Sequence, residues 1–85
     1  MDKQYITKYE FGTYYYKDPE KTIIHRTDGP AIVYPSGTKQ WLINGKLHRL
    51  DGPAAEYPNG NKQWVIDNSF IFEVNKSGKI IDRMK

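Results

Sequence analysis

Apolar and polar residues alternate along this chain in short runs, and turn-forming residues separate the runs. Each run is four to seven residues long, which suits a β-strand and is too short for a stable helix. Glycine, proline, asparagine and aspartate gather between the runs at 28–30, 35–37, 44–45, 51–53, 58–60 and 67–68. Because these residue types initiate tight turns, the pattern predicts an all-β protein.

The pattern recurs with a constant period of 23 residues. The segment His-Arg-Thr-Asp-Gly-Pro-Ala at 25–31 returns as His-Arg-Leu-Asp-Gly-Pro-Ala at 48–54, and Lys-Gln-Trp at 39–41 returns at 62–64. Such a period, with turn residues at fixed phases, indicates one supersecondary unit stacked on its copies. We therefore predict tandem β-hairpin repeats that form an antiparallel meander sheet of about eight to ten short strands.

The chain is predicted to form a single domain over residues 1–85. It comprises an imperfect N-terminal unit at about 5–25, repeats at about 25–47 and 48–70, and a closing hairpin at about 70–83. In the N-terminal unit Tyr16 is expected to take the place of Trp41, with two extra residues in the loop around 17–19. Divergent end units are expected because terminal repeats must present a soluble outer edge.

Comparison of the two copies predicts which residues face the covered side of the sheet. A buried position keeps its size between copies, whereas an exposed position can change. In the first strand of the hairpin the inward residues are Ile32, Tyr34, Ala55 and Tyr57, with Val33 and Glu56 outward. In the second strand they are Trp41, Ile43, Trp64 and Ile66, with Lys39 and Lys62 on the same side near the strand ends.

Composition narrows the classes of function. The chain has no cysteine, which excludes disulfides and thiolate chemistry, and its seven tyrosines, two tryptophans and three phenylalanines indicate a core rich in rings. The net charge of +3 is mild for a dedicated nucleic-acid binder. No apolar run has the length of a signal peptide or a membrane span, so we expect a cytoplasmic protein without membrane contact.

The His-Arg-x-Asp-Gly-Pro box brings imidazole, guanidinium and carboxylate groups together twice. A catalytic site generally needs one unique constellation in a pocket, whereas a repeat reproduces the same groups along a ladder. We expect the aspartate to bond backbone N–H groups two residues on, and the histidine and arginine to pair with that carboxylate or with carbonyls of the neighbouring copy. The predicted structural motif consists of His25, Arg26, Asp28, Gly29, Pro30, Trp41, His48, Arg49, Asp51, Gly52, Pro53 and Trp64.

The sequence contains no recognisable motif for catalysis, a cofactor or a metal. The glycines at 37, 45 and 60 are explained as turn residues, and no carboxylate cluster completes a metal site beside the two histidines. We expect a protein that is not an enzyme, with no catalytic residue, no cofactor and no metal ligand.

Aromatic and basic residues outside the regular pattern are the candidate contacts for a partner. Neighbouring strand residues face opposite sides, so Tyr16 can be core while Tyr15 points outward, unless the N-terminal segment covers it. Trp41 and Trp64 are interpreted as core residues, with base stacking as the alternative. The predicted partner-binding residues are Tyr14, Tyr15, Lys17, Lys21, Lys39 and Lys62.

The repeating units resemble MORN repeats (membrane occupation and recognition nexus), which are β-hairpins of similar length. The resemblance covers roughly residues 9–72 and is strongest to the variant in which His-Arg-x-Asp-Gly-Pro-Ala is followed by Gly, Trp and Asn-Gly, a form similar to repeats of phage, giant-virus and some bacterial proteins. In the second copy Asp67-Asn68 replaces Asn-Gly, and Ile71 replaces the next histidine. Since MORN arrays are scaffolding and protein-binding modules, with lipid binding proposed for some, the resemblance implies a hairpin array that binds a protein.

The leading hypothesis is a small non-enzymatic protein-binding module, a phage or bacterial accessory protein that masks the surface of a host protein in the host cytoplasm and so inhibits or modulates it. The alternative is a nucleic-acid or nucleotide binder that uses basic and aromatic side chains, including Lys39, Lys62 and the basic C-terminus. A third interpretation is a homodimer formed through the N-terminal edge strand. The pattern does not decide between an open and a curled sheet.

Overall fold

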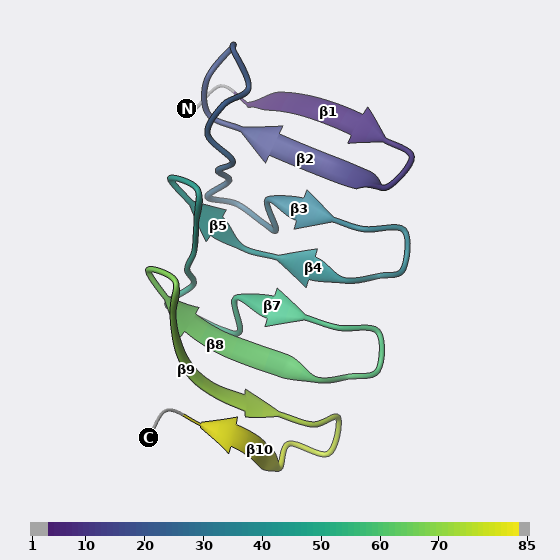
Figure 1. The fold of residues 1–85 in the computed structure, drawn as a ribbon, viewed down its shortest axis with the longest axis vertical. Helices are drawn as coiled ribbons and strands as arrows, with labels where there is room; N and C mark the ends of the chain where they lie inside the picture. The colour runs from purple at the N-terminus through teal and green to yellow at the C-terminus, as the bar shows by residue number, and fades with distance from the viewer. Residues whose placement is uncertain (1–3, 84–85) are drawn as a thin grey trace.

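Ten strands form the regular structure of residues 4–83, the range that the computed structural model describes (Figure 1). The strands are β1 (Tyr5–Tyr9), β2 (Gly12–Tyr16), β3 (Ile32–Val33), β4 (Lys39–Gln40), β5 (Leu42–Ile43), β6 (Lys46–Leu47), β7 (Ala55–Glu56), β8 (Lys62–Ile66), β9 (Ser69–Val74) and β10 (Ile80–Arg83). No helix occurs in that range. The predicted all-β class is confirmed.

Eight of the strands form one antiparallel sheet in the order β1-β2-β3-β4-β7-β8-β9-β10, and β5 and β6 form a separate hairpin. Successive hairpins are stacked along the long axis of the molecule, whose extents are 39 × 25 × 20 Å (Figure 1). Because β1 and β10 lie at opposite ends of the order, the sheet is open. The predicted antiparallel meander is confirmed.

The two-residue turns at 44–45 and 67–68 have the same backbone conformation. Both of their positions have positive φ, at 51° and 79° in the first turn and 48° and 67° in the second. Positive φ at both central residues is the type I′ geometry that matches the twist of a hairpin. Asp67-Asn68 adopts this geometry without a glycine, so the second hairpin turns as the first one does.

The buried face of the sheet differs from the predicted one in the second strand of each hairpin. Cross-strand neighbours share a face, and Ile32 lies opposite Gln40, so Leu42, two residues on, lies on the same face as Ile32. Leu42 is 8% exposed and its counterpart Val65 is 3% exposed. The residues of the second strand that were predicted to face the core are only half-buried, so that prediction was wrong. They are Trp41, Ile43, Trp64 and Ile66.

The first strand of each hairpin agrees with the predicted parity. Ile32 and Ala55 are buried, whereas Val33 and Glu56 each lie opposite Lys39 on the other face. The buried apolar residues are Tyr16, Ala31, Ile32, Leu42, Ala54, Ala55, Val65 and Val74. Tyr34 and Tyr57, also predicted to face inward, are half-buried. No large side chain is fully buried within residues 4–83, so the packing is that of a single-layered sheet with small residues at its centre.

The N-terminal unit has a different alignment from the predicted one. The Tyr15 N–H donates to the carbonyl of Ala31 (2.8 Å), as the Trp41 N–H does to Ala54 (2.7 Å), so Tyr15 and not Tyr16 occupies the place of Trp41. The Tyr15 carbonyl accepts from the N–H of the residue at 25, ten positions on, whereas the Trp41 carbonyl accepts from residue 48, seven positions on. The loop is therefore longer by three residues, not by two.

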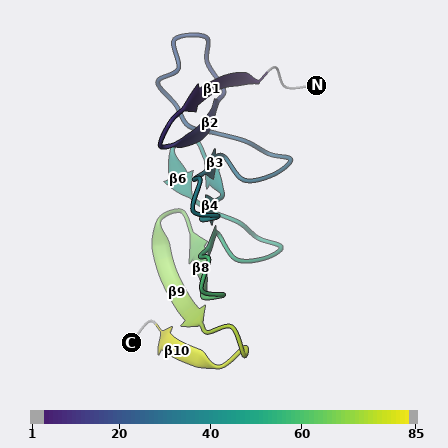
Figure 2. The same cartoon turned by 90° about the vertical axis from the view of Figure 1, so that its right-hand side faces the viewer.

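The segments that carry the Asp-Gly-Pro sequence form loops outside the plane of the sheet. Viewed edge-on, the loops before β3 and before β7 project to the same side (Figure 2). We call them the box loops, residues 26–31 and 49–54. They place the repeated arginine and aspartate side chains in two neighbouring, equivalent positions.

No helix in the described part of the chain could span a membrane.

Candidate functional site

Each box loop is closed by its own arginine. Arg26 Nε donates to Asp28 Oδ1 (2.8 Å), and its Nη1 donates to the carbonyl of Pro30 (3.2 Å). Arg49 makes the same two bonds in the second loop, 3.2 Å to Asp51 Oδ1 and 3.1 Å to the Pro53 carbonyl. Each guanidinium thus joins the start of its loop to its end, since bonds to a charged donor are among the stronger ones in proteins.

The glycine of each box leaves room for this guanidinium. A Cβ on Gly29 would lie 3.0 Å from Arg26 Cζ, and a Cβ on Gly52 would lie 2.9 Å from Arg49 Cζ. Neither glycine has a positive φ. Close approach of the arginine, and not backbone conformation, therefore explains why glycine suits this position.

The box aspartate was predicted to accept hydrogen bonds from backbone N–H groups two residues on, and it does not. The residue two positions on is proline, which has no N–H, and the carboxylate instead accepts from the arginine side chain. In the first box Asp28 also accepts from Gln4 Nε2 (2.8 Å). The hydrogen bonds from Arg26 and Gln4 lower the pKa of Asp28 below its ordinary value.

The arginines also cover the aromatic rings of the preceding strands. Arg26 Cζ lies 4.0 Å from the ring centroid of Tyr15, and Arg49 Cζ lies 4.1 Å from that of Trp41. Both distances are within the range of a cation–π interaction. One unit further on, Phe72 takes the place of the arginine and stacks on Trp64, with centroids 4.7 Å apart and an interplanar angle of 15°. The rings that were predicted to be core are therefore covered by side chains on the box side of the sheet.

Each box histidine supports the hairpin turn near the end of its own repeat. His25 Nδ1 accepts the backbone N–H of Asn44 (2.9 Å), and His48 Nδ1 accepts that of Asp67 (3.1 Å). The histidine was predicted to pair with the box carboxylate or with carbonyl groups, and it instead accepts from the first residue of each type I′ turn.

A cleft of about 510 Å³ lies between the two box loops. Trp41 and Ile43 line it together with side chains of both loops, namely Arg26, Thr27, Asp28, His48, Arg49, Leu50 and Asp51, and with Gly29. Leu50 is 80% exposed, the most exposed large apolar residue of the described chain. The carboxylates of Asp28 and Asp51 are also largely exposed. The cleft thus combines an apolar wall, an apolar tip on one loop and two acidic groups.

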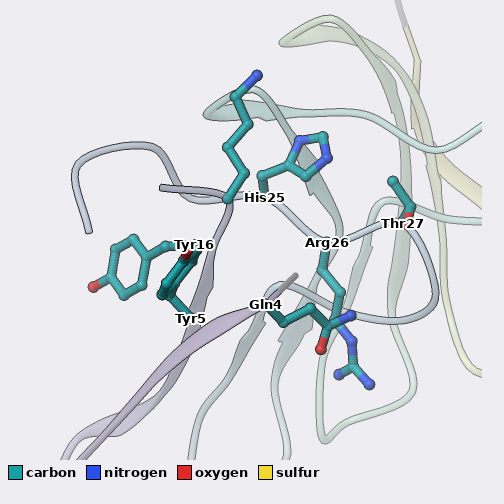
Figure 3. Close-up of a pocket in the computed structure, with 7 residues that line it drawn as sticks. Gln4, Tyr5, Tyr16, His25, Arg26 and Thr27 are labelled. Carbon is teal, nitrogen blue, oxygen red and sulfur yellow. The ribbon is translucent and has the colours of Figure 1, made fainter. Parts of the chain in front are cut away.

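A smaller cleft of about 320 Å³ lies in the equivalent position one unit earlier (Figure 3). Its lining residues are Gln4, Tyr5, Tyr16, Lys17, His25, Arg26 and Thr27. Gln4 reaches from the start of β1 to the carboxylate that Arg26 holds, so the N-terminal segment narrows this cleft. The cleft between the two loops is the larger of these two.

A cluster of five aromatic residues lies on the opposite, buried face of the sheet at its N-terminal end. We call it the ring cluster: Tyr9, Phe11, Tyr14, Tyr16 and Tyr34. Phe11 stacks on Tyr9 with centroids 4.7 Å apart, and these two rings are 58% and 42% exposed. The sequence pattern did not indicate this cluster, although rings at 9, 11, 14 and 16 on both sides of one tight turn are a signal for it.

Hydrogen bonds within the ring cluster favour the neutral phenols. The bond between the hydroxyls of Tyr9 and Tyr16 (3.5 Å), with burial, raises the pKa of Tyr16 to about 12. The hydrogen bond with Tyr34, with burial, raises the pKa of Tyr14 to about 12. Tyr14 and Tyr16 therefore keep their protons to a higher pH than an ordinary tyrosine does.

The six residues predicted to bind a partner do not converge on one site. Tyr14 belongs to the ring cluster, and Tyr15 is half-buried under Arg26 on the other face, so it is not an exposed anchor. The guanidinium of Arg26 lies over its ring. Lys17 Nζ donates to the side-chain oxygen of Asn44, and Lys21 Nζ lies 3.4 Å from the carbonyl of Ile6.

Lys39 and Lys62 lie on the box side of the sheet, on either side of Glu56. Lys39 faces Glu56 across one pair of strands, and Glu56 faces Lys62 across the next. Both lysines are exposed. The acid between them divides this row, which therefore has no continuous basic stripe.

The described residues contain no group of three or more His, Cys, Asp and Glu side chains that could hold a metal ion. Comparison with family models, with curated proteins and with solved structures finds no match to this chain. The resemblance to MORN repeats therefore stays a prediction from the sequence.

Proposed function

We propose that this protein is a small non-enzymatic module that binds another protein through the cleft between its box loops. In this proposal it is a phage or bacterial accessory protein, and it inhibits or modulates a host protein in the cytoplasm by masking part of that protein's surface. The observation that carries the proposal is Leu50, an apolar side chain held 80% exposed at the rim of a cleft lined by Trp41 and Ile43.

The box loops are suited to binding because they are held in shape before a partner arrives. The arginine of each loop bonds both of the loop's ends and packs on a ring below. Preorganised loops lose little conformational entropy on binding, so more of the contact energy contributes to affinity. Leu50 adjoins Trp41 and Ile43 in the lining of the cleft, and contiguous apolar surface of this kind marks interaction sites.

The chemistry of the cleft favours one kind of partner segment. An apolar side chain of the partner would enter between the loops and contact Leu50 and Trp41. Basic residues beside it would meet the exposed carboxylates of Asp28 and Asp51, and such complementary charges contribute to specificity and to the association rate.

The alternative function, a nucleic-acid or nucleotide binder, has less support from this arrangement. Stacking on bases needs accessible ring faces, whereas Arg49 covers one face of Trp41 and Phe72 covers one face of Trp64. The two arginines that line the cleft are each already paired with a carboxylate, which leaves them less available to phosphates.

The test is an affinity pull-down from bacterial lysate at low and at moderate salt, with nuclease-treated duplicates and three baits. The baits are the wild type, Leu50→Lys and the control Ile81→Lys, which changes a half-exposed isoleucine in β10. We expect a protein that survives salt and nuclease to be retained by the wild type and by the control, and to be lost with Leu50→Lys. Equal retention by Leu50→Lys would contradict binding at the cleft, and nucleic acid that is lost at moderate salt would support the alternative.

A further inference from the structure

Within residues 4–83, no strand pairs with the outer row of backbone groups of β1, which lies at the edge of the sheet. The N–H and carbonyl of Tyr15 bond Ala31 and His25, on the side away from β1. Ile6 lies opposite Tyr15, so its own N–H and carbonyl point away from β2, and those of Lys8, two residues on, do the same. The free edge of β1 thus presents the backbone groups of Ile6 and Lys8.

β1 is a regular strand, which makes this edge suitable for pairing. Its five residues pair with β2 without any shift of register. The other edge strand, β10, has an irregularity between Ile80 and Asp82, and such bulges protect edges from association. Ile6 and Tyr9 of β1 are 43% and 42% exposed.

We propose that two copies of this chain associate through β1, with the two strands antiparallel about a two-fold axis at Thr7. The strand Tyr-Ile-Thr-Lys-Tyr is nearly palindromic, so Thr7 then faces Thr7 of the second copy and Tyr5 faces the second copy's Tyr9. Ile6 faces Lys8 of the second copy and the two exchange backbone hydrogen bonds, which is what the free groups of the edge require. Aromatic pairs and Thr–Thr pairs are both favourable across antiparallel strands.

The side chain of Thr7 carries a second, independent indication. Its hydroxyl is buried and has no hydrogen-bond partner within residues 4–83. Buried polar groups without a partner are rare because they lose their bonds to water. In the proposed dimer Thr7 of the second copy lies directly opposite, and Thr–Thr hydrogen bonds occur across such pairs.

One side chain covers this edge in the single chain. Lys21 Nζ donates to the carbonyl of Ile6 over a long 3.4 Å, and a lysine at an edge strand opposes pairing. In the dimer the backbone hydrogen bonds between Ile6 and Lys8 of the second copy replace this long contact.

The dimer is independent of the proposed function, since β1 contributes no residue to the cleft between the box loops. The test is the molar mass of the full chain by sedimentation equilibrium, from low micromolar to millimolar concentration, for the wild type, Lys8→Pro and Lys8→Ala. Proline removes the N–H of residue 8, which has no hydrogen-bond partner within residues 4–83 but is needed in the dimer, and alanine keeps it.

We expect the wild type and Lys8→Ala to reach twice the mass of the single chain and Lys8→Pro to stay monomeric with an unchanged circular dichroism spectrum. The amides of Ile6 and Lys8 should also become protected from hydrogen exchange as the wild-type concentration rises, while that of Thr7 is protected throughout. A monomeric wild type at every concentration, or a dimer that persists in Lys8→Pro, would overturn the proposal. If Lys8→Pro fails to fold, concentration-dependent protection of Ile6 and Lys8 in the wild type decides the question.

Discussion

At the residue scale, the side chain of Arg49 makes several contacts at once. It bonds the carboxylate of Asp51, bonds the carbonyl of Pro53 and covers the ring of Trp41. Gly52 leaves the space that the guanidinium needs. These residues therefore act as one group, and changes in them are not additive.

This coupling predicts that Gly52→Ala is harmful only while the arginine is present. The added Cβ would lie 2.9 Å from Arg49 Cζ and displace it, with an expected loss of about 2 kcal/mol in the free energy of unfolding. In an Arg49→Met background the same change should cost much less. Urea unfolding of the four variants, followed by tryptophan fluorescence, measures the coupling, and equal costs in both backgrounds would refute it.

At the scale of the element, each hairpin turn depends on the histidine that begins the same repeat. His25 accepts the N–H of Asn44, and His48 accepts that of Asp67. Asn68 adds a second link, because its Oδ1 accepts the N–H of Leu47 (2.7 Å). Neighbouring units are thus joined through their turns as well as through the ladder of the sheet.

We predict that His25→Phe and His48→Phe each loosen only the turn that they support. Loss of the acceptor leaves one turn amide without its bond, at a cost of about 1 kcal/mol. Hydrogen exchange measured by NMR should become faster at Asn44 in the first variant and at Asp67 in the second. Faster exchange throughout the sheet in either variant would instead mean that the histidine supports the whole fold.

The ring cluster, which includes Tyr14 and Tyr16 of β2, makes the stability of the protein depend on pH in the alkaline range. Tyr14 and Tyr16 have pKa values raised to about 12, above the ordinary 10.0, so folding favours their neutral forms. Their contribution to stability is therefore complete below the ordinary pKa and is lost as pH rises through the raised one. Urea unfolding at increasing pH should show a falling stability between pH 10 and pH 12, and Tyr16→Phe should reduce the fall. A stability that stays constant over this interval would contradict the hydrogen bonds within the cluster.

Much of the whole molecule could be predicted from the sequence, because its strands and turns have local causes. Glycine, proline and asparagine mark the turns, and the period of 23 residues orders the hairpins along the sheet. The inward face of the second strand could not be predicted in this way. The constant size of Trp41 and Trp64 indicated a core position. The two rings instead stack with Arg49 and Phe72 on the box side of the sheet.

The candidate site was predictable only in its components. The box residues were recognised, but the cleft arises because two box loops project to the same side of the sheet, which is a property of the stack and not of one copy (Figure 2). The repeat pattern did not predict Leu50 as a site residue, because Thr27 occupies the equivalent position in the other copy. The alignment of Tyr15 with Trp41 was likewise hidden by the longer loop before His25.

Replacement of the third arginine by Phe72 determines where the array of clefts ends. The chain has no box after β8, so β9 pairs with β8 from Ser69 to Val74, with one shift of register between Trp64 and Val65, and has no projecting loop. A cleft of the larger kind needs two successive boxes, and this chain has two. The number of boxes therefore sets the number of binding clefts. Duplication of residues 25–47 would add a second such cleft, and loss of one box would leave none.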